Sequence, residues 1–365
     1  YFKIRAQFDY EMERNDKTEK LYASYIAIQC KRMGEDISFN PKAVSLIIDY
    51  GSRLARHQEK LTTQFTLILD VVKESIHWAK MHGRNIANEE DVIRTLKEKR
   101  YRGSLLEEKV HTSIIDNKVR IQTSGEQIGQ INGLSVIGSG EYMFGQPSRI
   151  TATAFPGKGG VMSVDKESEM SGAIFDKGAM IINSFITYAY GQKYPLPLSI
   201  SIAFEQNYGG IDGDSASAAE VIVTLSAISK LPIRQDLAIT GSMDQLGQIQ
   251  PIGGVNAKIE GFFDICLKRG LNGKQGVVIP SQNQKNLMLE DRVIDAVNKG
   301  LFNVYTIDRI EDAIELFFDK KPGKIDSNGF YPENTVNCII NEQLNIYHEL
   351  EKDSRHFCEE DEDEE

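Results

Sequence analysis

One serine in the chain stands where its hydroxyl could act as a nucleophile. Ser215 lies in the run Tyr208-Gly-Gly-Ile-Asp-Gly-Asp-Ser-Ala-Ser217, between a strand-like segment and a predicted helix. Glycines let the backbone turn tightly, and a helix start offers free N–H groups that can stabilise an oxyanion. The alternative is that Ser215 only caps the helix. Ser217 and Glu220 already have the spacing of a capping box, so Ser215 is not needed for that task.

A lysine further along the chain could supply the base. Lys258 ends the run Pro251-Ile-Gly-Gly-Val-Asn-Ala-Lys258, and on a helix it falls beside Val255, Phe262 and Ile265. Burial disfavours the ammonium form and can lower a lysine pKa by roughly 3–5 units, so the amine could accept a serine proton near neutral pH. The alternative is a lysine whose stem follows an apolar stripe while its charge stays in water.

Histidine chemistry is excluded by position. All six histidines lie outside the predicted mixed domain of residues 127–320, at positions 57, 77, 82, 111, 348 and 356. A Ser-His-Asp triad, a Cys-His pair at Cys266 and a zinc site with histidine ligands are therefore not expected there. If that domain is a hydrolase, its base is a lysine or a carboxylate, and no metal is expected.

The elements that must hold these residues fall into four segments. Residues 1–100 are predicted to form a helical bundle, residues 101–126 a polar linker, residues 127–320 a domain of strands and helices, and residues 321–365 an extension with an acidic tail. An all-α bundle followed by a mixed domain gives the fold class α+β.

Local signals place the main helices and strands. Leu198 to Glu205 alternates apolar and polar residues, as a strand with one buried face does. The expected helices are 18–33, one starting at Pro41, 61–82, 88–99, 170–190, 217–229, 255–269 and one after Asp308. The later expected strands are 237–240, 276–279 and 303–307.

Composition narrows the class of protein. A length of 365 residues suggests two folded units, and no apolar run reaches the roughly 18 residues that span a bilayer. The four cysteines are scattered, which favours a reducing cytoplasm. Seven of the acidic residues lie in 359–365, a terminal run typical of a solvated tail, and nothing indicates a nucleic-acid surface. The first residues have neither an initiator Met nor a signal-peptide layout, so a soluble fragment of a longer protein is expected.

Nucleotide hydrolysis by this chain alone is not expected. A phosphate loop needs the pattern GxxxxGK[ST], and the nearest approach is Gly157-Lys158-Gly159, which lacks the hydroxyl that holds magnesium.

Three motifs in order resemble the signature of Lon proteases. They are Asp212-Gly-Asp-Ser-Ala-Ser217, Leu231-Pro-Ile-Arg-Gln-Asp-Leu-Ala-Ile-Thr-Gly-Ser242 and Pro251-Ile-Gly-Gly-Val-Asn-Ala-Lys258, and the resemblance covers about 127–320. It implies a Ser-Lys dyad of Ser215 and Lys258 without a catalytic histidine. It also implies that Thr240 orients the lysine ammonium, where the alternative is an ordinary strand residue.

One departure assigns the chain to a branch of that family. Many bacterial Lon enzymes have Pro before the catalytic serine, whereas this chain has Asp214, and Asp212-Gly-Asp214 is more similar to the archaeal or B-type branch. The resemblance implies that these acidic residues pair with the lysine and modulate the site. Because a carboxylate beside Lys258 would raise its pKa, we hypothesise a resting site that is partly self-inhibited.

The helical segment resembles the small α-helical subdomain of AAA+ ATPases. Gly51-Ser-Arg-Leu-Ala-Arg56 lies where that family often carries a sensor arginine, so the resemblance implies a nucleotide-sensing role for Arg53. The alternative is a solvated helix arginine. The large ATPase subdomain would precede Tyr1, either truncated here or degenerate in the natural protein. ATP and Mg are therefore expected only for the full-length protein, and peptide hydrolysis itself is expected to need no cofactor.

The resemblance also implies an assembly and a reaction. A homohexameric ring encloses the active sites, unfolded or misfolded proteins are threaded in, and cleavage passes through an acyl-enzyme in the cytoplasm. Two other functions stay open: the same fold as an oligomerisation or DNA-repair accessory module without peptidase activity, and a binding scaffold unrelated to AAA+ ATPases.

Overall fold

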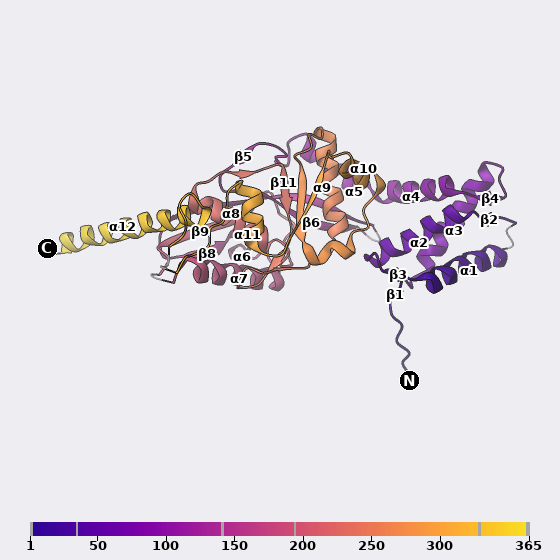
Figure 1. The fold of residues 1–365 in the computed structure, drawn as a ribbon, viewed down its shortest axis with the longest axis horizontal. Coiled ribbons are helices and arrows are strands. Elements are labelled where there is room, and N and C mark those ends of the chain that lie inside the picture. Colours follow the sequence, from indigo (N-terminus) through magenta and orange to yellow (C-terminus); the bar gives the residue numbers. More distant parts are fainter. Residues whose placement is uncertain (1–2, 34–35, 140–141, 193–194, 328–329, 363–365) are drawn as a thin grey trace. The chain divides into compact units, whose positions relative to one another are not determined.

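The computed structural model describes residues 3–33, 36–139, 142–192, 195–327 and 330–362 (Figure 1). The chain divides into two compact units, and each is treated by itself. The first comprises Tyr1–Lys109, Gly138–Met143 and Lys285–Glu290, and the second comprises Val110–Ile137, Phe144–Gln284 and Asp291–Glu365.

The first unit is a helical bundle around an apolar core that includes Tyr22, Ile47 and Val72. Its helices are α1 (Asp16–Arg32), α2 (Pro41–Ala55), α3 (Phe65–Met81) and α4 (Glu89–Gly103). Two small sheets pair β1 (Glu11–Glu13) with β3 (Lys60–Thr62), and β2 (Ser38–Phe39) with β4 (Ile86–Ala87). The predicted all-α class of this segment is confirmed, with only these short strands added.

Helices α2 and α4 start as predicted, whereas α1 starts at Asp16, two residues earlier than predicted, and α3 starts later. The side chains of Asn15, Asn40 and Asn88 each accept a backbone N–H at the start of a helix, as N-cap residues do. Helix α3 begins at Phe65, four residues later than predicted, because Lys60–Thr62 pairs with β1. That pairing is not local, so the helix periodicity could not reveal it.

A seven-stranded mixed sheet organises the second unit, and the predicted α+β class is confirmed. Its strand order is β15-β14-β11-β6-β7-β9-β8. The strands are β6 (Gln130–Ser139), β7 (Tyr142–Pro156), β8 (Gly160–Ser163), β9 (Leu198–Phe204), β11 (Leu237–Ile239), β14 (Gly276–Pro280) and β15 (Asn303–Ile307). β11, β14 and β15 run parallel to one another, whereas β7 and β9 are antiparallel.

Helices and short strands complete this unit. They are α5 (Leu105–Ile115), α6 (Val164–Glu167), α7 (Ala173–Tyr190), α8 (Ser217–Ser229), α9 (Val255–Arg269), the 3-10 helix η1 (Ser281–Asn286), α10 (Asp291–Asn298), α11 (Ile310–Phe318) and α12 (Val336–Glu362), with β5 (Glu126–Gln127), β10 (Ile233–Arg234), β12 (Ser242–Met243) and β13 (Ile249–Gln250). Helix α5 crosses the boundary between the units and lies inside the predicted linker of residues 101–126.

Helix α8 is the centre of the second core. All of its residues are buried, and it packs against α7, α11 and α12. The sequence of α8 is rich in Ala, Val, Ile and Leu on all sides of the helix. Such a helix is stable only when it is buried inside a domain. Its first turn is consequently fixed by packing on all sides. None of the helices in the described residues is long and apolar enough for a membrane span.

Helix α9 and strand β7 touch backbone to backbone. A Cβ added at Gly261 would lie 2.0 Å from the Gly145 carbonyl oxygen, and a Cβ added at Gly145 would lie 2.1 Å from the Ala257 carbonyl oxygen. Only glycine permits so close an approach. The contact fixes the turn of α9 that carries Lys258.

Replacing Gly261 by alanine tests this contact. In an ordinary helix the change stabilises by about 1 kcal/mol. Here the added methyl group meets backbone, so we expect Gly261→Ala to lower the free energy of unfolding by about 1–3 kcal/mol in urea denaturation. Gly253→Ala is the control, since a Cβ there meets nothing within 4 Å. A Gly261→Ala variant as stable as the wild type would contradict the close packing.

Candidate active site

Ser215 lies directly before the central helix α8. The backbone carbonyl of Ser215 accepts the Gly241 amide at 2.8 Å and the Thr240 hydroxyl at 3.0 Å. The Ala218 amide in turn donates to the Gly241 carbonyl at 3.0 Å. These bonds join the serine to the residues that follow strand β11, in the middle of the sheet. The position of its hydroxyl is thereby set by the core.

The helix-capping alternatives for this segment are wrong. The N-cap residue is Ala216, and no side chain caps α8. The Ser217 hydroxyl donates to the Asp214 carbonyl at 2.8 Å, so the predicted capping box with Glu220 does not form. Glu220 is 2% exposed. Burial, and to a lesser extent Asp165, raises its pKa to about 8. Glu220 therefore lies buried in the first turn of α8 and does not cap the helix.

Lys258 brings its amine to the serine from helix α9. The helix begins after Gly254, whose φ of 71° suits glycine, and Lys258 occupies its first turns. The Nζ atom lies 2.8 Å from Ser215 Oγ and 2.9 Å from Thr240 Oγ1. The structure thus brings together the three residues that the sequence singled out as nucleophile, base and orienting hydroxyl.

Burial tunes the lysine amine toward neutrality. Lys258 is 3% exposed, and this loss of water lowers its pKa to about 8, while the nearby Asp214 charge acts in the opposite direction. Its ordinary value is about 10.4. The alternative of a lysine that keeps its charge in water is wrong, because both ends of the side chain are enclosed.

The two aspartates of the serine loop reach different elements. Asp212 Oδ1 accepts the amides of Ile174 and Phe175 at 3.2 and 3.3 Å, at the start of α7. The Gly213 amide, together with these two bonds, lowers the pKa of Asp212. Asp214 Oδ2 instead accepts the Ser242 hydroxyl at 2.7 Å. Among the described residues, neither aspartate forms an ion pair with Lys258.

Ser242 was not among the sequence-predicted site residues. It ends the run Leu231 to Ser242 that contains Thr240, two residues earlier. A strand segment with hydroxyls two residues apart directs both to one face, and that spacing was the available signal.

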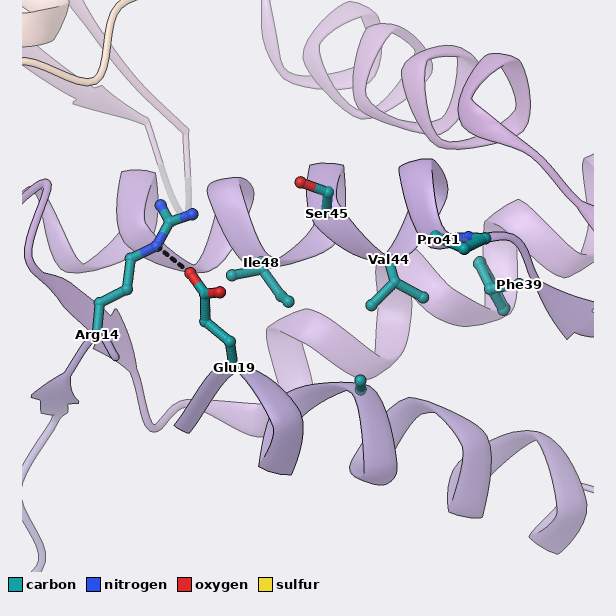
Figure 2. Close-up of a pocket in the computed structure, with 8 residues that line it drawn as sticks. Arg14, Glu19, Phe39, Pro41, Val44, Ser45 and Ile48 are labelled. Atoms are coloured by element: carbon teal, nitrogen blue, oxygen red, sulfur yellow. Dashed lines mark hydrogen bonds and ion pairs between the residues drawn. The ribbon is translucent and has the colours of Figure 1, made fainter. Parts of the chain in front are cut away.

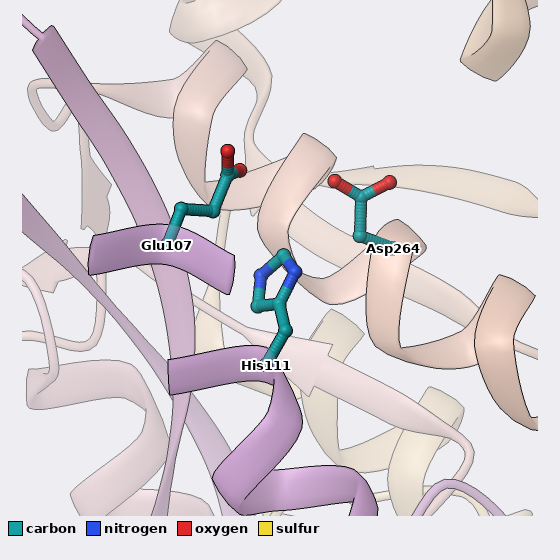
Figure 3. A group of neighbouring side chains, drawn as sticks. All are labelled: Glu107, His111 and Asp264. Atoms are coloured by element: carbon teal, nitrogen blue, oxygen red, sulfur yellow. The ribbon is translucent and has the colours of Figure 1, made fainter. Parts of the chain in front are cut away.

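The unit that contains the mixed sheet extends beyond the predicted bounds of 127–320 and includes histidines. A histidine side chain is therefore available in this unit as a possible metal ligand. His111 on α5 and His348 on α12 belong to the second unit. Ligand atoms of His111 and Asp264 lie within 4.8 Å of each other (Figure 3). Arg292 forms two hydrogen bonds with the Asp264 carboxylate, so a guanidinium already neutralises this group. The hydroxyl of Ser215 nevertheless has Lys258, and no imidazole, as its partner.

Arg53 is engaged within the first unit. Its guanidinium donates to the Met288 carbonyl at 2.5 Å and lies 3.6 Å from the Glu290 carboxylate. The alternative of a merely solvated arginine is therefore wrong, whereas its nucleotide-sensing role stays a prediction. A separate groove of about 410 Å³ opens between α1 and α2 (Figure 2). Arg14 borders this groove, and its guanidinium binds Glu19 and Asp49.

The helical first unit and the α+β second unit, with its serine beside a buried amine, match two family models that together define the class: a protease domain and an AAA+ lid. Residues 106–320 match the family described as Lon protease (S16) C-terminal proteolytic domain. Residues 38–102 match the family described as archaeal LonB, AAA+ ATPase LID domain. Because the proteolytic match covers more than half of the chain, the chain belongs to the Lon protease family.

Curated relatives agree with this assignment. A putative Lon protease homolog of Escherichia coli is 38% identical over 75% of this chain and 47% of its own length. A putative Lon protease homolog of Haemophilus influenzae is 46% identical over 63% of this chain and 38% of its own length. An archaeal Lon protease of Thermococcus kodakarensis is 27% identical over 82% of this chain and 45% of its own length. The chain spans less than half the length of these relatives.

The Thr240 hydroxyl can be tested by an isosteric change. Thr240→Val removes the acceptor 2.9 Å from Nζ and the donor to the Ser215 carbonyl. We expect kcat/KM for a peptide substrate to fall about 10²-fold, because a small misplacement of the base suffices for such a loss. Thr240→Ser keeps the hydroxyl and should retain most of the activity. Full activity in the Thr240→Val variant would show that the Thr240 hydroxyl is not needed for activity.

Proposed function

We propose that this chain is the proteolytic part of a Lon-type serine endopeptidase that degrades unfolded or misfolded polypeptides. Ser215 is the nucleophile and Lys258 the general base. The observation that supports these roles most directly is the separation of 2.8 Å between Ser215 Oγ and Lys258 Nζ, in a site where the lysine is 3% exposed. Membership of the Lon protease family supports the peptidase reaction.

The hydrogen bonds around the amine are consistent with a neutral lysine. The Thr240 hydroxyl donates to the Ser215 carbonyl, so its oxygen is left to accept an N–H of Lys258. The lone pair of a neutral amine then remains for the serine proton. The Thr240 hydroxyl thus links the Ser215 backbone to the Lys258 amine, and the amine lies against the Ser215 hydroxyl.

The reaction follows from this arrangement. Lys258 takes the Ser215 proton as Oγ attacks the carbonyl carbon, and the amine leaving group then recovers that proton as the C–N bond breaks. Water hydrolyses the acyl-enzyme with Lys258 again as base. We assign the Ala216 amide as an oxyanion donor, since it follows the nucleophile at the helix start and has no acceptor among the described hydrogen bonds.

The wider context is also proposed. The lid match supports coupling to an ATPase part that uses ATP and Mg, with Arg53 as a nucleotide sensor, whereas peptide hydrolysis itself requires no cofactor. The assembly we propose is a homohexameric ring with internal active sites. A reducing cytoplasm is proposed because Cys30, Cys266 and Cys338 are free thiols.

A covalent label distinguishes a peptidase from an accessory module with the same fold. We expect a peptide boronate or phosphonate to block cleavage of unfolded casein by the wild-type chain and to label it stoichiometrically. Ser215→Ala should lose both label and cleavage. The matched control is Ser217→Ala, which removes a neighbouring hydroxyl but leaves the nucleophile. Equal labelling of the Ser215→Ala variant would show that this serine is not the nucleophile.

The pH dependence tests the base. A protonated amine cannot accept a proton, so kcat/KM should rise with pH through about 8, the pKa to which burial lowers Lys258. Lys258→Met should reduce kcat/KM by at least about 10³-fold at pH 8.

The same pKa predicts a change in stability. The unfolded chain binds more protons than the folded chain between pH 8 and about 10, so the Lys258 contribution to the free energy of unfolding should increase across that window. Lys258→Met should remove this contribution, as measured by urea denaturation at several pH values. A wild-type and a Lys258→Met curve with the same pH dependence would contradict a lowered lysine pKa.

A further inference from the structure

The Asp214 carboxylate has two potential partners at the active site. One is the Lys258 amine, whose pKa this charge raises, and the other is the Ser242 hydroxyl. Only the hydroxyl is bound, at 2.7 Å from Oδ2. Which partner Asp214 binds matters for the reaction, because a lysine that pairs with a carboxylate stays protonated and cannot accept a proton.

Ser242 is built into the structure so that it faces this carboxylate. It is 3% exposed and belongs to β12, which pairs with β13 so that Ser242 lies opposite Gln250. Its Oγ is 3.4 Å from Gln250 Oε1, much farther than from Asp214. A hydroxyl has a single proton, and the nearer, charged acceptor forms the stronger bond. Ser242 therefore donates to Asp214.

One short segment separates the base from the carboxylate. The Thr240 hydroxyl contacts the Lys258 amine, and two residues later the Ser242 hydroxyl binds the Asp214 carboxylate. Both hydroxyls come from the chain that follows β11, and both side chains are buried. Each ionisable group thus has its own neutral partner, and the ion pair between them is avoided.

We propose that Ser242 is a positioning residue whose hydroxyl holds the Asp214 carboxylate away from the Lys258 amine and so keeps the lysine available as a base. This inference rests on the proposed roles of Ser215 and Lys258. It also specifies when the hypothesised self-inhibition occurs: with Ser242 bound to Asp214 the site is ready, and with Asp214 bound to Lys258 it is blocked.

Other charges near the lysine do not offer the same switch. Among the described residues, Asp214 is the one charged group that acts on the pKa of Lys258. On α9 itself, Asp264 is bound by Arg292. Elements other than α9 bring Ser215 and Thr240, which are uncharged, and Gly145 of β7 against Lys258. A change in the lysine pKa after mutation of Ser242 can therefore be traced to Asp214.

The test is a pH profile of kcat/KM for four proteins: wild type, Ser242→Ala, Asp214→Asn and the double variant. Ser242→Ala releases the carboxylate toward the amine, so we expect the midpoint of the profile to move at least about one pH unit upward. At pH 7 this corresponds to a loss of about tenfold, which is recovered at high pH. Asp214→Asn should not raise the midpoint, and the double variant should behave like Asp214→Asn. Ser242→Thr, which keeps a hydroxyl, should restore the wild-type midpoint.

A matched control separates positioning from simple loosening of the loop. The Ser217 hydroxyl donates to the backbone carbonyl of Asp214, so Ser217→Ala weakens the same loop without releasing the carboxylate. Its midpoint should stay at the wild-type value. The proposal is overturned if Ser242→Ala lowers kcat/KM equally at every pH, or if its effect persists in the Asp214→Asn background.

A readout without catalysis keeps this test apart from that of the proposed function. NMR titration of the Lys258 amine can be followed in the Ser215→Ala chain with and without Ser242→Ala. If the pKa of Lys258 is higher in the chain that carries both Ser215→Ala and Ser242→Ala than in the Ser215→Ala chain, the role of Ser242 is supported whether or not the wild type cleaves peptides. An unchanged lysine pKa rejects it, while absent cleavage by the wild type rejects only the proposed function.

Discussion

The second unit depends on one energetically unfavourable placement: a primary amine enclosed by protein. Water would stabilise the charge of Lys258, and its removal favours the neutral form. The surrounding structure makes this tolerable by giving the amine two hydroxyl oxygens, from Ser215 and Thr240. A buried polar group with partners of the right kind is stable, and here the same partners hold the amine beside the serine hydroxyl.

Rigid elements hold this amine in place. The serine precedes a helix that is buried on every side, and the lysine sits on a helix whose backbone touches that of β7 at Gly145 and Gly261. Precision in such a site comes from the scaffold and not from the loop alone. Glycine at the contact and small or β-branched residues along α8 are therefore as much a part of the site as the reactive groups, although none of them reacts.

Much of this could be predicted from local sequence. Helices α8 and α9 have the predicted bounds, because the apolar run of α8 and the glycines on both sides of α9 are local signals. The start of α3 was misplaced because β3 pairs with a distant strand. Glu220 was expected at a helix cap, yet packing buried it. The separate partners of Asp212 and Asp214 could not be predicted. The glycine between them indicated a turn, and Gly213 has φ of 94°, but the residue types do not show which distant group each carboxylate reaches.

The bonds from Asp212 to the first turn of α7 connect two parts of the chain that are far apart in sequence. The same carboxylate lies three residues before the reactive serine. Fraying of that turn and loosening of the serine loop are therefore coupled, since breaking the Asp212 bonds frees both segments. Local stability at the start of α7 therefore contributes to the order of the loop that carries the serine.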